Sequence, residues 1–404
     1  MSIDYSWHRR AQDSIAQNYL TNSKRPQSHI LGVVPSHIVR GEGCFLWDHT
    51  GKKYMDFVTG LGANLLGYGN QTISRAMAEW LTKGFSHSLA TTLEVETAEK
   101  LKECMPFVDC FKFLKSGSEA CSAAVKIARA STGRTYVLSD GYHGWHDDFV
   151  ALTDPALGVP REPRFPRAIN TLKRLDQVSP ILAAVIVEPV ITDHSEARRA
   201  YLQTLREACT KYGVMLIFDE VITGMRWPKF SVAGLWNIVP DLIVLGKGLA
   251  NGMPLAAVGG KYPVMNCDYF VSSTYAGETL SLAAAKASII ALHTKHDLQW
   301  LWDKGTAFWK KFNEAAFGVV SFEGYPTRGK LVGATTAKAL FLQESCKAGL
   351  LFNASPFFNF PLAEAAFDAL GAISALCQQI RQGEVVLEGE LPAMPFAQKV
   401  REKQ

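Results

Sequence analysis

The sequence predicts an α/β protein: a large domain in which helices cover a mostly parallel sheet, joined to a smaller α+β domain. Three observations predict this fold class. Between about residues 70 and 260, short apolar runs alternate with helical stretches of ten or more residues, which is the pattern of βαβ units. Several of these runs are continuously apolar, as expected of strands buried on both faces. Beyond about residue 285, helices alternate instead with a few short strands.

The N-terminal part predicts a helix, a polar arm and a hairpin, in that order. Residues 1–30 begin with a helical pattern, which the segment Tyr19–Pro26 interrupts. Cys44–Trp47 and Tyr54–Val58 then flank the turn Asp48–Lys53, an arrangement typical of a β-hairpin.

Six apolar runs are the predicted strands of the large domain: Cys110–Leu114, Thr135–Ser139, Ala183–Val187, Met215–Phe218, Leu242–Leu245 and Ala256–Gly259. The smaller domain is predicted to contain three helices and two strands: helices Ala284–Thr294, Leu298–Ala316 and Leu362–Arg381, and strands Val319–Glu323 and Ala339–Gln343. From Gly383 onward the chain is polar and interrupted by prolines, which favours a loose tail. We therefore expect an N-terminal part of the small domain at 1–60, a large domain at 61–285 and the rest of the small domain at 286–404.

Charge, hydropathy and cysteine spacing exclude several classes of protein. Lys and Arg number 42 and Asp and Glu number 38, so the formal net charge of +4 over 404 residues gives no reason to expect a nucleic-acid partner. No apolar run approaches the roughly 18–20 residues of a membrane span, and the N-terminus lacks the apolar core of a signal peptide. The eight cysteines are scattered without a CxxC pair, which favours reduced thiols and a cytoplasmic protein.

The first motif that carries chemistry is the turn Lys115–Ala120, between a predicted strand and an alanine-rich helix. Ser116, Gly117 and Ser118 combine hydroxyl groups with backbone N–H groups at the positive end of a helix dipole, which suits a phosphate. The alternative is a plain N-cap, in which Ser116 or Ser118 caps the helix and no ligand binds.

Two further motifs follow predicted strands directly. Asp219 comes after Met215–Phe218, at the edge where α/β proteins bind ligands, and a buried carboxylate there needs a cationic partner. Lys247 lies between two glycines after Leu242–Leu245, where desolvation can free a nucleophilic amine. The alternatives are a structural ion pair for Asp219 and an exposed loop position for Lys247.

The loop Gly141–Asp148 admits two interpretations. His143, His146 and Asp147 could ligate a metal, but no distant ligand pair with zinc-like spacing accompanies them, so we predict no metal. Tyr142 could instead stack on a flat heterocycle. A second serine- and threonine-rich segment, Ser272–Ser281, predicts either another anion site or a turn and helix cap.

Together these motifs indicate pyridoxal 5′-phosphate as the cofactor. A phosphate-binding turn, an aromatic ring, a carboxylate at a strand end and a glycine-flanked lysine are the groups that this cofactor requires. The lysine can form a Schiff base with it, and the acid can pair with its protonated ring nitrogen.

The chain resembles the class III aminotransferases of the fold-type I pyridoxal-phosphate enzymes, and most of all the glutamate-1-semialdehyde 2,1-aminomutase group. The matching segments follow the family order over roughly residues 30–290 and are Asp48–Phe57, Lys115–Ala120, Tyr142–Gly144, Glu188–Pro189, Asp219–Arg226, Gly246–Gly260 and Ser273–Leu280. This resemblance implies a large domain with a mostly parallel, seven-stranded type of sheet.

The resemblance also implies a role for each matching residue. Lys247 would form the Schiff base, Asp219 would pair with the ring nitrogen, and Val221 would pack on the ring. The remaining implied cofactor-binding residues are Ser116, Gly117, Ser118, Tyr142, His143 and Glu188. Thr274 would reach the phosphate of a neighbouring subunit, so the resemblance implies a homodimer with the active site at the subunit interface.

Three segments differ from the family pattern and affect the expected substrate, and one of them is the N-terminal arm Arg25–His29. Ala276–Thr279 stands where the family often has Gly-Gly-Asn-Pro, and Phe352–Phe360 carries four phenylalanines and two asparagines. Four aromatic rings can form an apolar wall for a larger substrate, or they can pack the core of the small domain. No arginine is securely placed as a carboxylate clamp, and Arg25 and Arg226 are weak candidates.

We therefore expect a pyridoxal-phosphate aminotransferase that acts, through Lys247, on a carbonyl-containing biosynthetic intermediate. The first alternative is glutamate-1-semialdehyde 2,1-aminomutase, an isomerase activity. The second is a decarboxylase or epimerase on the same fold, because the orientation of the scissile bond, which the sequence does not determine, selects among these reactions.

Overall fold

The computed structural model describes residues 6–25, 28–30, 32–150, 167–168 and 175–389. These residues divide into two compact units. The large unit is the described part of Gln71–Gln299, and the small unit is the described parts of Met1–Asn70 and Trp300–Ala397. The sequence analysis places the corresponding boundaries after residues 60 and 285.

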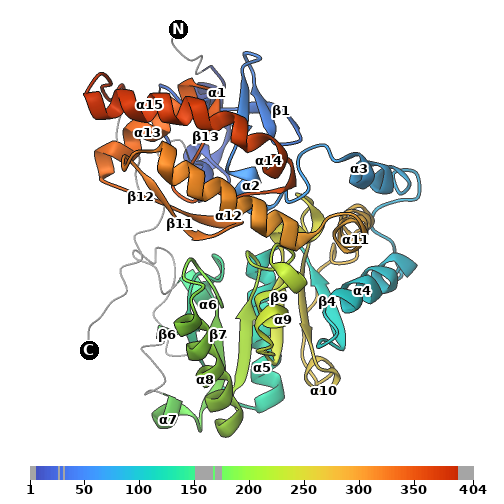
Figure 1. Cartoon of the computed structure of the whole chain (residues 1–404). Helices are drawn as coiled ribbons and strands as arrows, with labels where there is room; N and C mark the ends of the chain where they lie inside the picture. The colour runs from blue at the N-terminus through green and yellow to red at the C-terminus, as the bar shows by residue number, and fades with distance from the viewer. Residues whose placement is uncertain (1–5, 26–27, 31, 151–166, 169–174, 390–404) are drawn as a thin grey trace. The chain divides into compact units, whose positions relative to one another are not determined.

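A seven-stranded sheet forms the centre of the large unit, with the order β4-β10-β9-β8-β7-β5-β6 (Figure 1). Strands β6, β5, β7, β8 and β9 are parallel to one another, whereas β10 is antiparallel to both β9 and β4. It follows that β4 runs in the same direction as β9. The strands are β4 Cys110–Leu114, β5 Tyr136–Asp140, β6 Arg167–Ala168, β7 Leu182–Val187, β8 Met215–Asp219, β9 Leu242–Leu245 and β10 Ala256–Gly260.

The helices of the large unit begin and end at residues with known capping preferences. Ser195 caps the N-terminus of α8, and Gly133 and Gly213 end α5 and α8 in the left-handed conformation that glycine adopts without strain. The helices are α3 Gln71–Ala78, α4 Thr92–Cys104, α5 Gly117–Thr132, α6 Asp147–Val150, α7 Leu175–Val178, α8 Glu196–Tyr212, α9 Val232–Trp236, α10 Tyr262–Met265 and α11 Thr279–Thr294, with 3-10 turns at Pro228–Phe230 and Lys247–Ala250.

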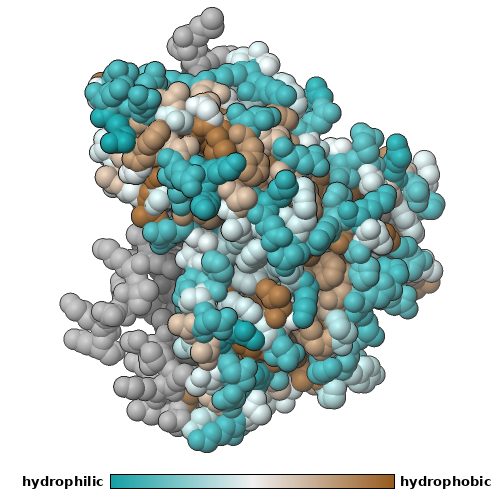
Figure 2. Space-filling model, viewed as in Figure 1, coloured by the Kyte–Doolittle hydropathy of each residue, from teal (hydrophilic) through white to brown (hydrophobic). Residues whose placement is uncertain are grey.

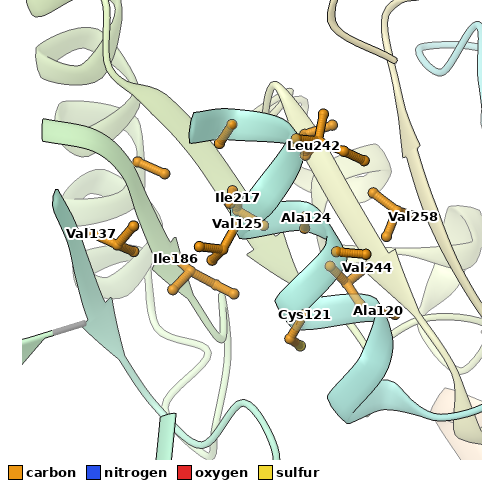
Figure 3. Close-up of a cluster of buried hydrophobic side chains, with 14 of the residues drawn as sticks. Ala120, Cys121, Ala124, Val125, Val137, Ile186, Ile217, Leu242, Val244 and Val258 are labelled. Carbon is orange, nitrogen blue, oxygen red and sulfur yellow. The ribbon is translucent and has the colours of Figure 1, made fainter. Parts of the chain in front are cut away.

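Helix α5 packs closely against the sheet because the side chains on its inner face are small (Figure 3). Ala120, Cys121 and Ala124 are each at most 1% exposed. Opposite them, β-branched and leucine side chains from five strands complete the core, among them Val137, Ile186, Ile217, Leu242, Val244 and Val258. The small residues therefore bring the start of α5 close to the strand ends.

The structure confirms the six predicted strands of the large unit, with bounds that differ by at most one residue at either end. The additional strand, β6, is two residues long and pairs with β5. A pair of residues carries too little of a strand pattern to be predicted from the sequence.

The small unit contains a four-stranded sheet of order β1-β2-β3-β13 and a separate two-stranded sheet, β11-β12. The predicted hairpin is confirmed as β2 and β3, which are antiparallel. The strands are β1 Ile38–Glu42, β2 Phe45–Asp48, β3 Lys53–Asp56, β11 Ser321–Tyr325, β12 Arg328–Val332 and β13 Leu350–Leu351; the helices are α1 Ser6–Ser14, α2 Thr59–Gly62, α12 Leu298–Ala315, α13 Thr335–Lys347, α14 Phe360–Ala365 and α15 Leu370–Gln382, with 3-10 turns at Ala16–Asn18, Asn22–Lys24 and Ala366–Ala369.

Aromatic side chains form the core of the small unit. The ring of Phe352 stacks on that of Phe57, with centroids 4.1 Å apart, and the ring of Phe358 stacks on that of Phe308 at 5.2 Å. All four phenylalanines of the segment Phe352–Phe360 are buried. Of the two predicted roles for this segment, the structure supports packing of the core, and these rings give no reason to expect a large apolar substrate.

The predicted strand Ala339–Gln343 is wrong, because these residues lie inside helix α13. The run Ala-Leu-Phe-Leu-Gln is apolar enough for a buried strand, but it is flanked by residues that favour helices, such as Lys338 and Glu344. A short apolar run cannot distinguish the two structures by periodicity alone. Here Ala339, Phe341 and Gln343 are all buried within the helix.

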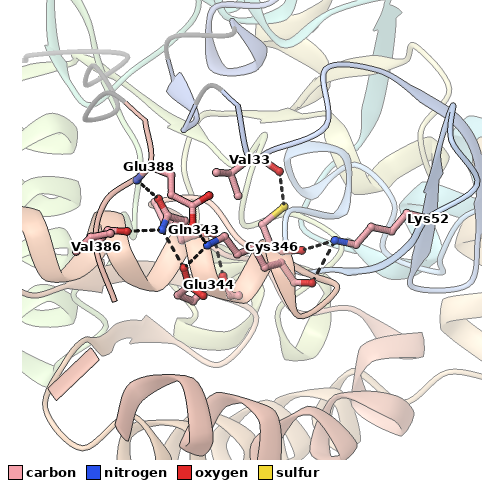
Figure 4. A network of polar contacts seen from close by, with 10 residues as sticks. Val33, Lys52, Gln343, Glu344, Cys346, Val386 and Glu388 are labelled. Atoms are coloured by element: carbon pink, nitrogen blue, oxygen red, sulfur yellow. Dashed lines mark hydrogen bonds and ion pairs between the residues drawn. The ribbon is translucent and has the colours of Figure 1, made fainter. Parts of the chain in front are cut away.

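The residues that follow α15 are held against α13 rather than loose, at least as far as Glu388 (Figure 4). The buried Gln343 side chain donates to the carbonyl oxygen of Val386 at 2.9 Å and accepts from the backbone N–H of Glu388 at 2.8 Å. Lys347 forms an ion pair with the Glu388 carboxylate. The predicted start of the loose tail at Gly383 is therefore too early. The sequence alone does not show that the buried amide of Gln343 binds the residues up to Glu388.

One helical stretch among the described residues, Phe360–Gln382, is long and apolar enough to cross a membrane by composition alone, with a mean hydropathy of 1.4. The apolar residues of this stretch are not consecutive, so no single apolar run in the sequence indicates it. Some 44% of its most apolar window is buried, as in a helix that contributes to a core. In the view of Figure 2, hydrophilic side chains cover most of the surface and hydrophobic ones form smaller patches.

Candidate functional site

The topology of the large unit brings the carboxyl ends of five strands to one edge of the sheet. Strands β4, β5, β7, β8 and β9 run in the same direction. In the ladder, Asp219 of β8 lies opposite Val244 of β9, and Lys247 follows three residues later. The strand-end motifs of the sequence therefore meet where open α/β sheets bind ligands.

The turn after β4 forms a complete capping box at the start of α5. The Ser116 hydroxyl accepts from the backbone N–H of Glu119 at 3.3 Å, and the Glu119 carboxylate accepts from the N–H of Ser116 at 2.9 Å. Ser116 is thus the N-cap. Among the described residues, the N–H groups of Gly117 and Ser118 have no hydrogen-bond partner, so they can bind an anion at the positive end of a 16-residue helix.

Val221 connects the start of α5 to the turn that follows β9. A Cβ atom placed on Gly117 would lie 3.0 Å from the Cγ1 of Val221, and one on Gly246 would lie 3.3 Å from the same atom. The glycines therefore allow the two turns to approach Val221 closely. This contact places the predicted ring-packing residue between the anion-binding turn and Lys247.

Asp219 is buried at the end of β8 and accepts hydrogen bonds at both oxygens. Its Oδ2 lies 2.7 Å from Nδ1 of His143 and 3.4 Å from the Sγ of Cys121. Its Oδ1 accepts from the backbone N–H of Val221 at 3.0 Å. These donors hold the carboxylate in one orientation and stabilise its negative charge.

His143 is buried, and it pairs with Asp219 through one ring nitrogen only. Among the described residues its Nε2 atom has no partner, while its ring makes an edge contact with Phe149 at 5.3 Å. The metal interpretation of the sequence also included His146, which instead contacts the Ser122 hydroxyl at 3.0 Å. The two histidines of this loop therefore have separate partners.

Tyr142 and Glu188 lie together beside His143. The Glu188 carboxylate accepts from the backbone N–H of Tyr142 at 2.8 Å, and a Cβ atom on Gly141 would lie 2.8 Å from the same oxygen. The phenol of Tyr142 is partly exposed. Partial burial, together with the nearby thiol of Cys121 and carboxylates of Asp219 and Glu188, raises its pKa.

Lys247 has a strained backbone, with φ of 40° in the left-handed region. A residue with a Cβ atom pays about 1–3 kcal/mol for such a conformation, which is common at functional sites. The side chain is half-buried, and its positive charge lies close enough to Cys121 to oppose the rise in that thiol's pKa. The charge of Lys247 therefore acts on the same thiol that donates to Asp219.

Thr274 lies apart from these groups, exposed in the loop before α11. Its neighbour Tyr275 is 60% exposed. Glu278 ends the loop, caps α11 and forms an ion pair with Lys115 at 3.0 Å. Of the predicted site residues, Thr274 is the one with no described contact to the others.

The chain matches the family model "Aminotransferase class-III" over residues 27–355. It belongs to the class III aminotransferase family. Curated relatives include glutamate-1-semialdehyde 2,1-aminomutases of Nitrosomonas europaea, 34% identical over 72% of both chains, and of Syntrophobacter fumaroxidans, 29% identical over 88% of this chain and 95% of that one. The family membership confirms the resemblance found in the sequence and identifies the chain as an enzyme of this class.

Solved structures of other proteins share the fold of this chain. The FumI protein of Sphingopyxis sp. MTA144, in its PLP internal aldimine form, aligns with a TM-score of 0.86 at 22% identity over 95% of this chain and 97% of that one. An ω-transaminase from Sphaerobacter thermophilus aligns with a TM-score of 0.81 at 22% identity over 93% and 98%. These alignments confirm the fold-type I architecture.

The family implies pyridoxal phosphate, and the groups of this class III aminotransferase fit it. The unpaired N–H groups of Gly117 and Ser118 suit a phosphate, and the buried Asp219 carboxylate suits a protonated ring nitrogen. The unpartnered Nε2 of His143 is a buried polar atom of the kind that a ligand satisfies. These groups therefore fit the phosphate and the protonated ring nitrogen of pyridoxal phosphate.

Sequence reasoning missed Cys121 and the Lys115–Glu278 ion pair. Cys121 follows Gly117 by one helical turn and so lies on the same face of α5, a spacing that could have identified it. Cys121, His143 and Asp219 also have ligand-type atoms within 4.8 Å of one another, as a metal site would. Burial and the Asp219 charge raise the pKa of the thiol well above its usual value, so it is a hydrogen-bond donor.

Proposed function

We propose that this protein is a pyridoxal-phosphate-dependent aminotransferase that binds its cofactor covalently through Lys247. One observation carries the proposal: the buried Asp219 carboxylate and the Lys247 amine follow neighbouring parallel strands, beside the unpaired N–H groups of α5. In enzymes of this kind an acid pairs with the ring nitrogen, a lysine holds the aldehyde and a phosphate site holds the phosphate. Here Asp219, Lys247 and the turn at the start of α5 would take these three roles.

Each residue of the site would perform a separate task. The N–H groups of Gly117 and Ser118, with the Ser118 hydroxyl, would bind phosphate, and Val221 and Tyr142 would confine the ring between them. Asp219 would keep the ring nitrogen protonated, and the hydrogen bond from His143 would fix the carboxylate in place. Pyridoxal phosphate, when bound, supplies the electron-withdrawing ring that stabilises charge developing on a substrate carbon.

Lys247 would act twice on the substrate. Its Nζ amine would release the cofactor to the amino group of the substrate, and it would then move a proton from the substrate carbon as a general base. Glycines on either side of Lys247 leave the approach to this amine open.

A homodimer would complete the site, with Thr274 reaching the phosphate of the neighbouring subunit. Large apolar side chains are exposed near this loop, including Phe270 at 79% and Trp145 at 69%. Both line a cavity of about 750 Å³ together with Ser272 and Ser273. Exposed aromatic residues around a cavity support a protein interface.

All eight cysteines are free, which supports a reducing compartment such as the cytoplasm.

Glutamate-1-semialdehyde 2,1-aminomutase activity is the second candidate, because the curated relatives carry that name. The buried phenylalanines of Phe352–Phe360 remove the argument for a larger apolar substrate. An aminotransferase needs a separate amino donor, whereas an aminomutase moves the amino group within one molecule. Donor dependence therefore separates the two.

The test incubates the cofactor-loaded protein with glutamate-1-semialdehyde and, separately, with a panel of other aldehydes and ketones. Each reaction is run with and without an amino donor, and products are identified by mass spectrometry. Donor-dependent amination of a panel member supports the aminotransferase. Efficient isomerisation of the semialdehyde without a donor supports the aminomutase, and the absence of both reactions contradicts the proposal.

A further inference from the structure

The thiol of Cys121 has a specific contact with Asp219. Cys121 is the fifth residue of α5 and is 1% exposed, and Figure 3 shows it on the sheet-facing side of the helix. Its Sγ lies 3.4 Å from Oδ2 of Asp219, a normal distance for a thiol that donates to oxygen. Cys121 and His143 thus converge on one oxygen of a buried carboxylate.

The protonation state of the thiol makes it a permanent donor. Burial first, and then the negative charge of Asp219, raise the pKa of Cys121 well above its usual value. The thiol is therefore protonated at neutral pH and can act as a donor. A thiolate at this distance would instead repel the carboxylate.

We propose that Cys121 is a positioning residue, whose S–H group donates to Asp219 and thereby helps the carboxylate keep the cofactor's ring nitrogen protonated. The inference rests on the proposed function. The donors from Cys121 and His143 occupy Oδ2 and fix the orientation of the carboxylate. A carboxylate held in one orientation can accept a hydrogen bond from a protonated ring nitrogen, and the proton on that nitrogen makes the ring a stronger electron acceptor.

Three variants separate hydrogen bonding from packing. Cys121→Ala removes the donor and a small volume, and Cys121→Ser keeps a donor of similar size. Cys209→Ala is the matched control, because Cys209 is equally buried in α8 and its side chain has no contact with Asp219.

The first measurement uses protein without cofactor. Infrared difference spectra between the wild type and Cys121→Ala isolate the S–H stretching band of Cys121. We expect this band at a lower frequency than the band isolated with Cys209→Ala, because a strong acceptor weakens the S–H bond. A Cys121 band at the Cys209 frequency would contradict the hydrogen bond, whatever the protein's function.

The second measurement uses protein loaded with ¹⁵N-labelled pyridoxal phosphate, and records the chemical shift of the ring nitrogen. In Cys121→Ala we expect the signal to move toward the value for unprotonated pyridine, and in Cys121→Ser and Cys209→Ala to stay near the wild type. A bound cofactor whose signal is unchanged in Cys121→Ala overturns this inference alone. Failure of the wild type to bind the cofactor overturns the proposed function as well.

Discussion

At the scale of single residues, Lys247 combines a strained backbone with its proposed role as the lysine that binds the cofactor. Its φ of 40° costs free energy that a glycine would not lose. Position 247 is nonetheless a lysine and not a glycine, although glycines occupy both neighbouring positions. The strain is consistent with a side chain that is held in place for its amine rather than for stability.

Replacing Lys247 with alanine should stop turnover while leaving non-covalent cofactor binding possible. We expect the absorption band of the Schiff base, which borohydride removes from the wild type, to be missing, and activity to fall at least about a hundredfold because the general base is lost. Spectrophotometry and a turnover assay check this. Near-normal multiple turnover in Lys247→Ala would contradict the assignment.

Asp56 makes the small unit sensitive to pH. It is buried, accepts from the Tyr68 hydroxyl at 2.6 Å, and burial raises the pKa of its carboxyl from 3.8 to about 6. Between these values the folded protein binds more protons than the unfolded chain, so the stability that Asp56 contributes falls as pH rises.

We therefore expect the melting temperature of the wild type to fall, relative to Asp56→Asn, as pH rises from about 4 to about 6, and the difference to level off above about pH 7. Calorimetric scans across this range test it. A difference that does not change with pH would show that Asp56 is ionised in both states throughout.

At the scale of elements, Lys115 and Glu278 link the strand end before α5 to the start of α11. Their side chains are only 16% and 17% exposed, and the charged atoms lie 3.0 Å apart. Glu278 also accepts from the N–H groups of Leu280 and Ser281. Glu278 lies in Ala276–Thr279, the segment that differs from the family pattern, and its roles as helix cap and ion-pair partner explain why an acidic residue stands there.

A double-mutant cycle with Lys115→Met and Glu278→Gln should give a coupling free energy of about 1–2 kcal/mol in thermal unfolding, because the pair is largely desolvated. The exposed pair Lys261–Asp109, at 51% and 41% exposure, is the control and should give a smaller coupling, because solvent screens exposed charges. Equal coupling in the two cycles would mean that burial does not strengthen the Lys115–Glu278 pair.

Most strands of the large unit were predictable because several of them are continuous apolar runs, such as Leu242–Leu245, that end at a charged or glycine-rich turn. The site was predictable for the same reason, since parallel strands bring their ends together. Prediction failed where tertiary contacts decide the structure. Ala339–Gln343 is helical although Ala339, Phe341 and Gln343 are buried alternately, as they would be in a strand. The burial of Cys121 against Asp219 depends on how closely α5 packs.

At the scale of the whole molecule, the family model covers most of the chain, yet Thr274 has no described contact with the other predicted site residues. A symmetric dimer would resolve this by placing each Thr274 at the site of the other subunit. The exposed aromatic side chains near the loop are the surface that such a dimer would cover.

Mixing two inactive variants tests this arrangement. In a heterodimer of Lys247→Ala and Thr274→Glu, one site takes its lysine and its threonine from unmutated positions, so activity should return when subunits exchange. Sedimentation checks that both variants are dimers. No recovery despite exchange would mean that Thr274 acts within its own subunit or not at all.

The Lys115–Glu278 ion pair also restricts which substitutions this chain can tolerate during evolution. A substitution that removes one charge leaves the other half-buried beside the α5 turn, where an unpaired charge is costly. We expect natural variants of this protein to change positions 115 and 278 together by losing both charges, because an exchange would put a lysine at the N-cap of α11, where the side chain must accept from backbone N–H groups. The two positions, 163 residues apart in sequence, would then be inherited as one unit.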